Sequence, residues 1–99
     1  MNVNGVRIVA AIPGVVLLVS GFGWLTDPAA AAEGLGMPLL EGMGRSTQIG
    51  DFAAFFLGGA AIALIGAWTA RKEWLLAAAM LVAGAAVMRT VAFAAHDAP

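Results

Sequence analysis

The sequence has 99 residues, of which 62% are hydrophobic and 11% charged, and its formal net charge is −1. A soluble domain is about 45–50% apolar and about 25% charged, and a chain this short has too much surface to hide such an excess of apolar residues. The composition therefore disfavours a small soluble bundle. The lack of a basic stripe argues against nucleic acid as a partner, and the absence of cysteine excludes disulfides and thiolate chemistry.

The first apolar run covers residues 8–25 and contains no charge. A membrane-spanning helix needs about 20 mostly apolar residues, so the run predicts a helix over about 6–25. Pro13 and Gly14 predict a kink or weak point inside it, which membrane helices tolerate. A signal peptide is the rival interpretation, because Arg7, an apolar run and small residues follow in order. The run exceeds the usual h-region of about 7–15 residues, which favours a spanning helix.

The stretch "TDPAAAAEG" that follows predicts a short helix over about 28–33. Asp27 is expected as its N-cap, Pro28 as its first residue and Gly34 as its stop. The next residues, "LGMPLL", are too apolar for water and are expected to lie in the membrane–water interface on the outer side. Ser46 is then a possible cap for the next helix.

Two further apolar runs predict helices over about 46–70 and 73–96. Only Arg89 and Thr90 interrupt the last run. The predicted fold is all-α: one membrane domain, 1–99, with three transmembrane helices and a short interfacial helix in the first loop. No period-2 alternation suggests a barrel.

Basic residues mark two of the segments outside the apolar runs. Arg7 precedes the first run, and Arg71 with Lys72 separates the second from the third. Because an excess of Lys and Arg marks the cytoplasmic side, the sequence predicts a bacterial cytoplasmic (inner) membrane protein with its N-terminus inside and its C-terminus outside. Tryptophans at predicted helix ends are expected to anchor the chain at the interfaces: Trp24, Trp68 and Trp74.

Two opposite charges lie inside the predicted spans. Asp51 is roughly 7–8 Å from the predicted start of the second long helix, and Arg89 is about 9 Å from the predicted end of the third, at 1.5 Å per residue. Both of these helix ends are expected on the outer side, so the two charges should lie at similar depth. The sequence therefore predicts an interhelical polar pair, with His96 one level further out. The pair either fixes helix register or binds an anion, a proton or a headgroup; both interpretations stay open.

Small residues predict close helix packing in the second long helix. Four of them form the expected packing strip: Gly58, Gly59, Ala63 and Gly66. The strip spans too wide an arc for one neighbour, which predicts a homo-oligomer or contact with helices of a larger membrane complex. No nucleophile–base pair, metal cluster or nucleotide motif is visible. We therefore predict no catalytic residue, metal or cofactor, and an enzyme is the least favoured class.

Three segments carry a resemblance to a known family: "GFGWLTDPAAAAEGLGMPL", "STQIGDFAAFFLGGAAIALIGAW" and "EWLLAAAMLVAGAAVMRTVAF". Together they resemble an uncharacterised family of small bacterial membrane proteins that is similar to the DoxX-like four-helix bundles. Asp51, the Gly58–Gly59 pair and Arg89 occupy the matching positions. The resemblance implies a fourth helix, whereas this sequence ends at "HDAP", so either it is truncated or a partner completes the bundle. The resemblance implies no activity.

These patterns favour a non-enzymatic accessory or scaffold subunit that packs against other membrane helices in the bilayer. The alternative is a small carrier or binder of a lipid-like or anionic ligand at the outer face.

Overall fold

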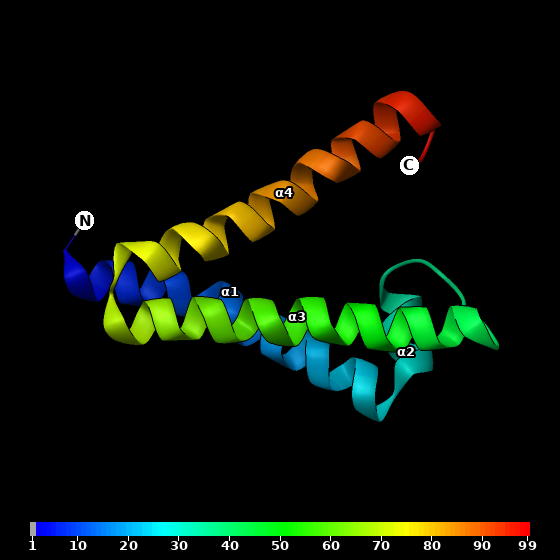
Figure 1. Ribbon diagram of the computed structural model, residues 1–99, viewed down its shortest axis with the longest axis horizontal. Helices are drawn as coiled ribbons and strands as arrows, with labels where there is room; N and C mark the ends of the chain where they lie inside the picture. Colours follow the sequence, from blue (N-terminus) through cyan, green and yellow to red (C-terminus); the bar gives the residue numbers. More distant parts are fainter. Residues whose placement is uncertain (1) are drawn as a thin grey trace.

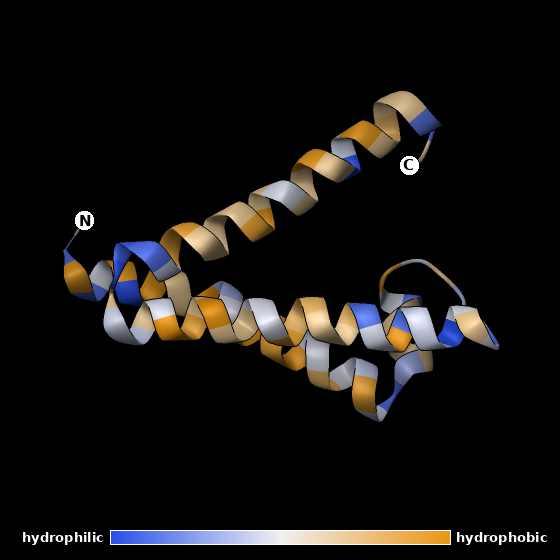
Figure 2. Cartoon of the chain, viewed as in Figure 1, coloured by the Kyte–Doolittle hydropathy of each residue, from blue (hydrophilic) through white to orange (hydrophobic). Residues whose placement is uncertain are grey.

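The computed structural model describes residues 2–99, in which all regular secondary structure is helical and no strand is present. Its helices are α1 (Val3–Thr26), α2 (Pro28–Gly34), α3 (Met43–Thr69) and α4 (Lys72–His96) (Figure 1). α1, α3 and α4 are each long and apolar enough to cross a membrane. Figure 2 shows hydrophobic residues recurring along the full length of all three. The predicted all-α membrane fold is thereby confirmed.

The closest helix contact joins α1 to α3, because glycine on α1 lets the two backbones approach. A Cβ atom at Gly14 would lie 2.8 Å from Leu64 Cδ2, and one at Gly21 would lie 2.6 Å from Leu57 Cγ. Residues seven apart share a helix face, so both glycines present one smooth surface to α3. α1 remains helical through Pro13, whose side chain is exposed.

The short helix α2 begins as its sequence predicts. Asp27 Oδ1 accepts a hydrogen bond from Ala30 N at 3.3 Å, and proline occupies the first helical position. The end differs from the expectation, because Gly34 remains helical and Gly36 is the residue with positive φ, +78°. Gly36 N and Met37 N donate to carbonyls of the last turn at 2.9 and 3.0 Å. These two bonds form a Schellman motif, which requires the left-handed residue just beyond the helix.

α3 begins at Met43, about one turn earlier than the expected start near Ser46. Gly42 is its N-cap, and no side chain caps the helix, so the expected cap at Ser46 is wrong. The loop is tied down instead by Gln48, which is only 4% exposed. Gln48 Oε1 accepts from Leu40 N at 2.6 Å, and Gln48 Nε2 donates to the Pro38 carbonyl at 3.0 Å. The oxygen and the nitrogen of the Gln48 carboxamide thus both hold the loop on α3.

The core cluster lies where α1 ends and α3 begins, beneath α2. Trp24, Ala32 and Ala53 are buried there, and Met37 and Leu39 of the "LGMPLL" segment pack against them. The segment therefore contributes to the core of the chain, although the sequence predicted only contact with the interface. This packing accounts for Met37 and Leu39, whereas Leu35 and Leu40 of the same segment are exposed.

α4 is the least attached helix of the chain. A turn at Ala70 and Arg71 leads into it, and its first half touches α3, where Leu75 approaches Gly66 and Leu81 approaches Gly59. Beyond this point α4 diverges from the α1–α3 pair toward its C-terminal end (Figure 1). No residue of α4 is buried.

Candidate functional site

The three predicted polar residues are all exposed: Asp51, Arg89 and His96. Within residues 2–99 the structure contains one ion pair, Arg71 Nε to Glu73 Oε2 at 3.4 Å, so the expected Asp51–Arg89 pair is not formed in this single chain. The reason is the divergence of α4, which carries Arg89 away from α3. His96 lies in the last turn of α4.

The two opposite charges nevertheless match in their distance from the α3–α4 turn. Asp51 precedes Thr69, the last residue of α3, by 18 residues, and Arg89 follows Lys72, the first residue of α4, by 17. At 1.5 Å per residue both lie roughly 26 Å along their helices from the turn. The two charges therefore lie at similar distances along their helices from the turn, and they do not contact each other.

The four residues of the predicted packing strip do not all face another helix of the chain. Gly59, Ala63 and Gly66 are buried between helices. Gly58 is exposed, and a Cβ placed there would meet nothing within 4 Å. One residue turns a helix by about 100°, so neighbouring glycines point to different surroundings.

The three tryptophans occupy three different environments. Trp24 is 1% exposed and stacks on Phe52 with 5.0 Å between ring centroids. It is therefore a core residue, and its expected role as an anchor facing the membrane interface does not fit its burial. Trp68 is 84% exposed, and Trp74 is half-buried near the α3–α4 turn. Only Trp68 presents its whole ring to the surroundings.

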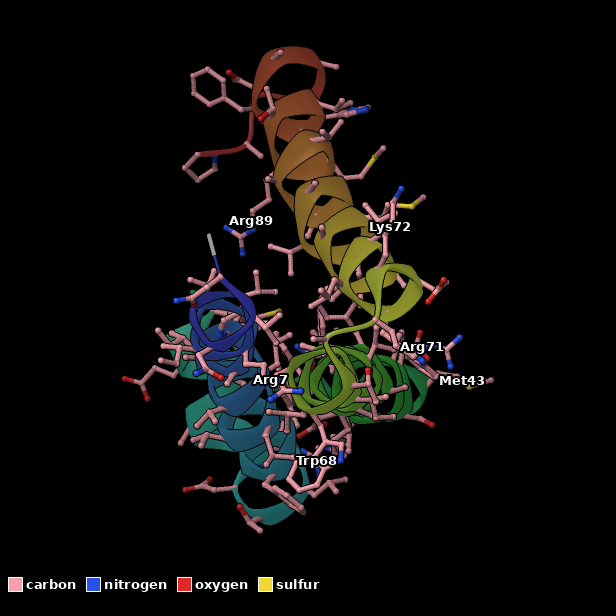
Figure 3. All side chains as sticks on the ribbon, turned by 90° about the vertical axis from the view of Figure 1, so that its left-hand side faces the viewer. Arg7, Met43, Trp68, Arg71, Lys72 and Arg89 are labelled. Atoms are coloured by element: carbon pink, nitrogen blue, oxygen red, sulfur yellow. The ribbon has the colours of Figure 1, made fainter. Side chains whose placement is uncertain are left out.

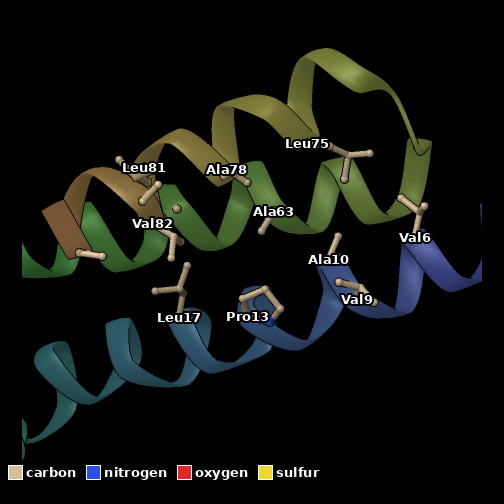
Figure 4. A pocket seen from close by; sticks show the side chains of 14 residues that line it. Val6, Val9, Ala10, Pro13, Leu17, Ala63, Leu75, Ala78, Leu81 and Val82 are labelled. Carbon is tan, nitrogen blue, oxygen red and sulfur yellow. The ribbon is translucent and has the colours of Figure 1, made fainter. Parts of the chain in front are cut away.

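An apolar groove opens between α4 and the α1–α3 pair (Figure 4). Its volume is about 600 Å³, and all of its lining residues are apolar. α1 contributes larger side chains, including Val9, Pro13 and Leu17, whereas the α4 wall contains many alanines. This groove, named here the α4 groove, exists because α4 diverges.

Arg89 lies just beyond the residues that line the α4 groove, on the same face of α4. Val82 and Ala86 line the groove, and Arg89 comes seven residues after the first and three after the second, which places all three on one side of α4. Figure 3 shows the Arg89 side chain extending from α4 on the side where α1 lies. The apolar surface of the groove therefore has a permanent positive charge at the end nearer the C-terminus of α4.

The opposite end of the molecule is basic. Arg7, Arg71 and Lys72 lie at the end where the chain begins and where α3 turns into α4 (Figure 3). Arg7 and Trp68 also line an open hollow of about 650 Å³ between α1 and α3. A basic and aromatic end is typical of the cytoplasmic membrane interface.

No family model, curated protein or solved structure matches the chain. Its class is therefore assigned from its own helices: three long apolar segments indicate an integral membrane protein. Within residues 2–99, no three His, Asp or Glu side chains lie together as a possible metal site. The features that carry functional information are the α4 groove and the two unpaired charges, Asp51 and Arg89.

Proposed function

We propose that this protein is a non-enzymatic accessory or scaffold subunit whose α4 packs against a helix supplied by another chain. The observation that carries the proposal is that α4 is 25 residues long and buries none of them within its own chain. Lipid tails are as apolar as a leucine, so association in the bilayer depends on close packing, which small residues permit. Ala79, Ala83 and Ala86 on the wall of the α4 groove are residues of this kind.

The resemblance to the DoxX-like four-helix bundles is consistent with this proposal, because one added helix beside α4 would complete a bundle of four. The partner is then either another copy of the chain or a helix of a larger membrane complex. In either case the proposal requires a protein surface in the α4 groove.

Photo-crosslinking in native membranes tests the proposal directly. A photoreactive amino acid at Ala86 is expected to give discrete protein adducts, because a partner helix would lie against the groove. The matched control is Val15, which is exposed on α1 and does not line the groove. Protein adducts at Ala86 but not at Val15 would support a partner helix. Only lipid adducts at both positions would overturn the proposal.

A binder of a lipid-like or anionic ligand at the outer face is the second candidate. The observation that favours it is an apolar groove of about 600 Å³ with Arg89 one turn beyond its lining. Such a surface fits an acyl or isoprenoid chain with an anionic headgroup. Native mass spectrometry from a gentle detergent would then show one bound small molecule, and Arg89→Gln would abolish its retention.

The orientation we propose places the basic end in the cytoplasm of a bacterium and the C-terminus outside. Its support is the gathering of Arg7, Arg71 and Lys72 at one end of the molecule. A reporter fused after Pro99 should be active only outside the cytoplasm, and one fused at Lys72 only inside. The reverse pattern would contradict this orientation. A mature N-terminus near Glu33 would instead establish the signal peptide.

A further inference from the structure

We propose that the missing partner of α4 is a second copy of this chain, and that Asp51 of one copy pairs with Arg89 of the other. This inference rests on the proposed function and names its partner. It explains one observation that packing alone leaves unexplained. Asp51 lies eight residues after the first residue of α3, and Arg89 lies seven residues before the last residue of α4, so both charges lie about two turns inside their apolar helices. Neither is paired within residues 2–99.

The first argument is depth. Asp51 and Arg89 lie 18 and 17 residues from the α3–α4 turn, as measured from Thr69 and Lys72. Two copies inserted in the same orientation would therefore hold the acid of one and the base of the other at nearly equal depth. A lone charge in a bilayer is costly, and pairing with an opposite charge lowers that cost for both groups.

The second argument is that the outer half of α3 already has its partners within the chain. Trp24 stacks on Phe52, and Gln48 bonds the preceding loop, so α1, α2 and the loop cover the other sides of α3. Asp51 remains exposed next to this assembly. Gly58 lies seven residues further along the same face, and open space surrounds its Cβ position. An incoming helix can therefore approach the α3 backbone closely beside Asp51.

The third argument is the direction of α4. Both the side chain and the backbone of Leu75 lie close to Gly66: a Cβ atom placed at Gly66 would lie 3.1 Å from Leu75 Cδ2 and 3.3 Å from Leu75 N. This contact holds the first turn of α4 against α3. From Leu81 onward α4 diverges, and a Cβ at Gly84 would meet nothing within 4 Å. The segment that carries Arg89 is thus free to reach a neighbour.

The fourth argument is symmetry. Each copy offers one Asp51 and one Arg89, so a two-fold axis along the membrane normal would form two identical pairs in one dimer. Such an interface is self-complementary and closed, which is the commonest arrangement of homo-oligomers. An unrelated partner would need to supply an acid and a base at the same depth.

Mixing two neutralised variants in differently tagged copies tests the pairing. Asp51→Asn and Arg89→Gln should each reduce self-association several-fold in nanodiscs. In the mixture, the dimer between the two variants keeps one intact pair, Asp51 of the second variant with Arg89 of the first. It should therefore form several-fold more than either variant's homodimer, as measured by native mass spectrometry. Random mixing without any preference gives twice as much mixed dimer as either homodimer, so a mixed dimer no more abundant than that would overturn the pairing.

Cysteine crosslinking provides a second readout that does not alter either charge. The sequence contains no cysteine, so Thr47→Cys and Phe93→Cys introduce single thiols one turn outward from Asp51 and Arg89. Copies carrying one thiol each should form a disulfide-linked dimer on oxidation with copper phenanthroline. The matched control replaces Thr47→Cys with Ala61→Cys, which should give no dimer with Phe93→Cys.

Three outcomes separate this inference from the proposed function. A disulfide that forms only within a chain carrying both thiols would show closure of α4 onto its own α3, and it would overturn pairing between copies. Photo-adducts from Ala86 to a different protein would support the scaffold function, but they would overturn the proposal that the partner is a second copy of this chain. Lipid adducts alone would overturn both. The doubly reversed chain, Asp51→Arg with Arg89→Asp, should recover the dimer and so exclude misfolding as the cause of the losses.

Discussion

Replacing Trp24 by alanine should lower the free energy of unfolding by about 3 kcal/mol, the low end of the range for truncating a buried tryptophan. Trp24 is 1% exposed, and it packs between α2 and α3 in the core cluster with Ala32 and Ala53. Alanine would leave a cavity the size of an indole ring and remove the stack on Phe52. The loss should therefore loosen α2, the C-terminal end of α1 and the N-terminal end of α3 together.

The low end applies because the unfolded reference of a membrane protein keeps its helices in the bilayer. The part of the penalty that comes from exposing apolar surface to water is then small, and the lost packing contacts dominate. Pulse proteolysis in mixed micelles would measure the unfolding free energy. Trp68→Ala is the matched control, because Trp68 is 84% exposed and should cost well under 1 kcal/mol. Equal losses from the two substitutions would contradict the placement of Trp24 in the core.

The sequence predicts those parts of this fold that depend on local chemistry. Three apolar runs of spanning length predict α1, α3 and α4 because a bilayer selects helices of that length. Asp27 and Pro28 predict the start of α2 because capping involves only neighbouring residues. Gly34 was the wrong stop, since Gly36 lies only two residues further on and either glycine can adopt positive φ. Choosing between them depends on where Met37 packs.

The sequence does not predict which neighbour each helix face meets. Trp24 at a helix end was expected at the membrane interface, but α2 folds back and covers it. Gly58 and Gly59 look equivalent in a run of small residues, and only the crossing of α1 and α4 over α3 separates them. The distance of Asp51 and of Arg89 from the α3–α4 turn follows from counting residues along each helix. Their separation follows from the angle between α3 and α4, which no local pattern encodes.

The role of Gln48 is not predicted from the sequence, because the residues just before it, "GMGRST", show neither a helical nor a strand pattern of apolar residues. The available signal was a single amide side chain directly ahead of a long apolar run. In such surroundings a polar group must find partners, since an unpaired buried amide is costly. The structure supplies those partners from the backbone eight and ten residues earlier in the chain.

Replacing Gln48 by leucine should cost about 1–3 kcal/mol for each backbone group left without a partner. Two groups depend on this side chain: the Leu40 amide, 2.6 Å from Gln48 Oε1, and the Pro38 carbonyl, 3.0 Å from Gln48 Nε2. Leucine is similar in size, so the loss would come from hydrogen bonds and not from a cavity. Unlike the effect of Trp24→Ala, this effect should be concentrated in the segment between α2 and α3.

Hydrogen exchange in detergent would locate the change, because the Leu40 amide should lose its protection while amides in the middle of α3 keep theirs. Ser46→Ala is the matched control: Ser46 is exposed two residues earlier on α3 and makes no capping bond. Alanine is the better helix former by up to about 0.5 kcal/mol, so this variant should be neutral or slightly stabilised. Unchanged exchange at Leu40 in the Gln48→Leu protein would mean that the loop is held by contacts other than the Gln48 side chain, such as Met37 and Leu39 on the core cluster.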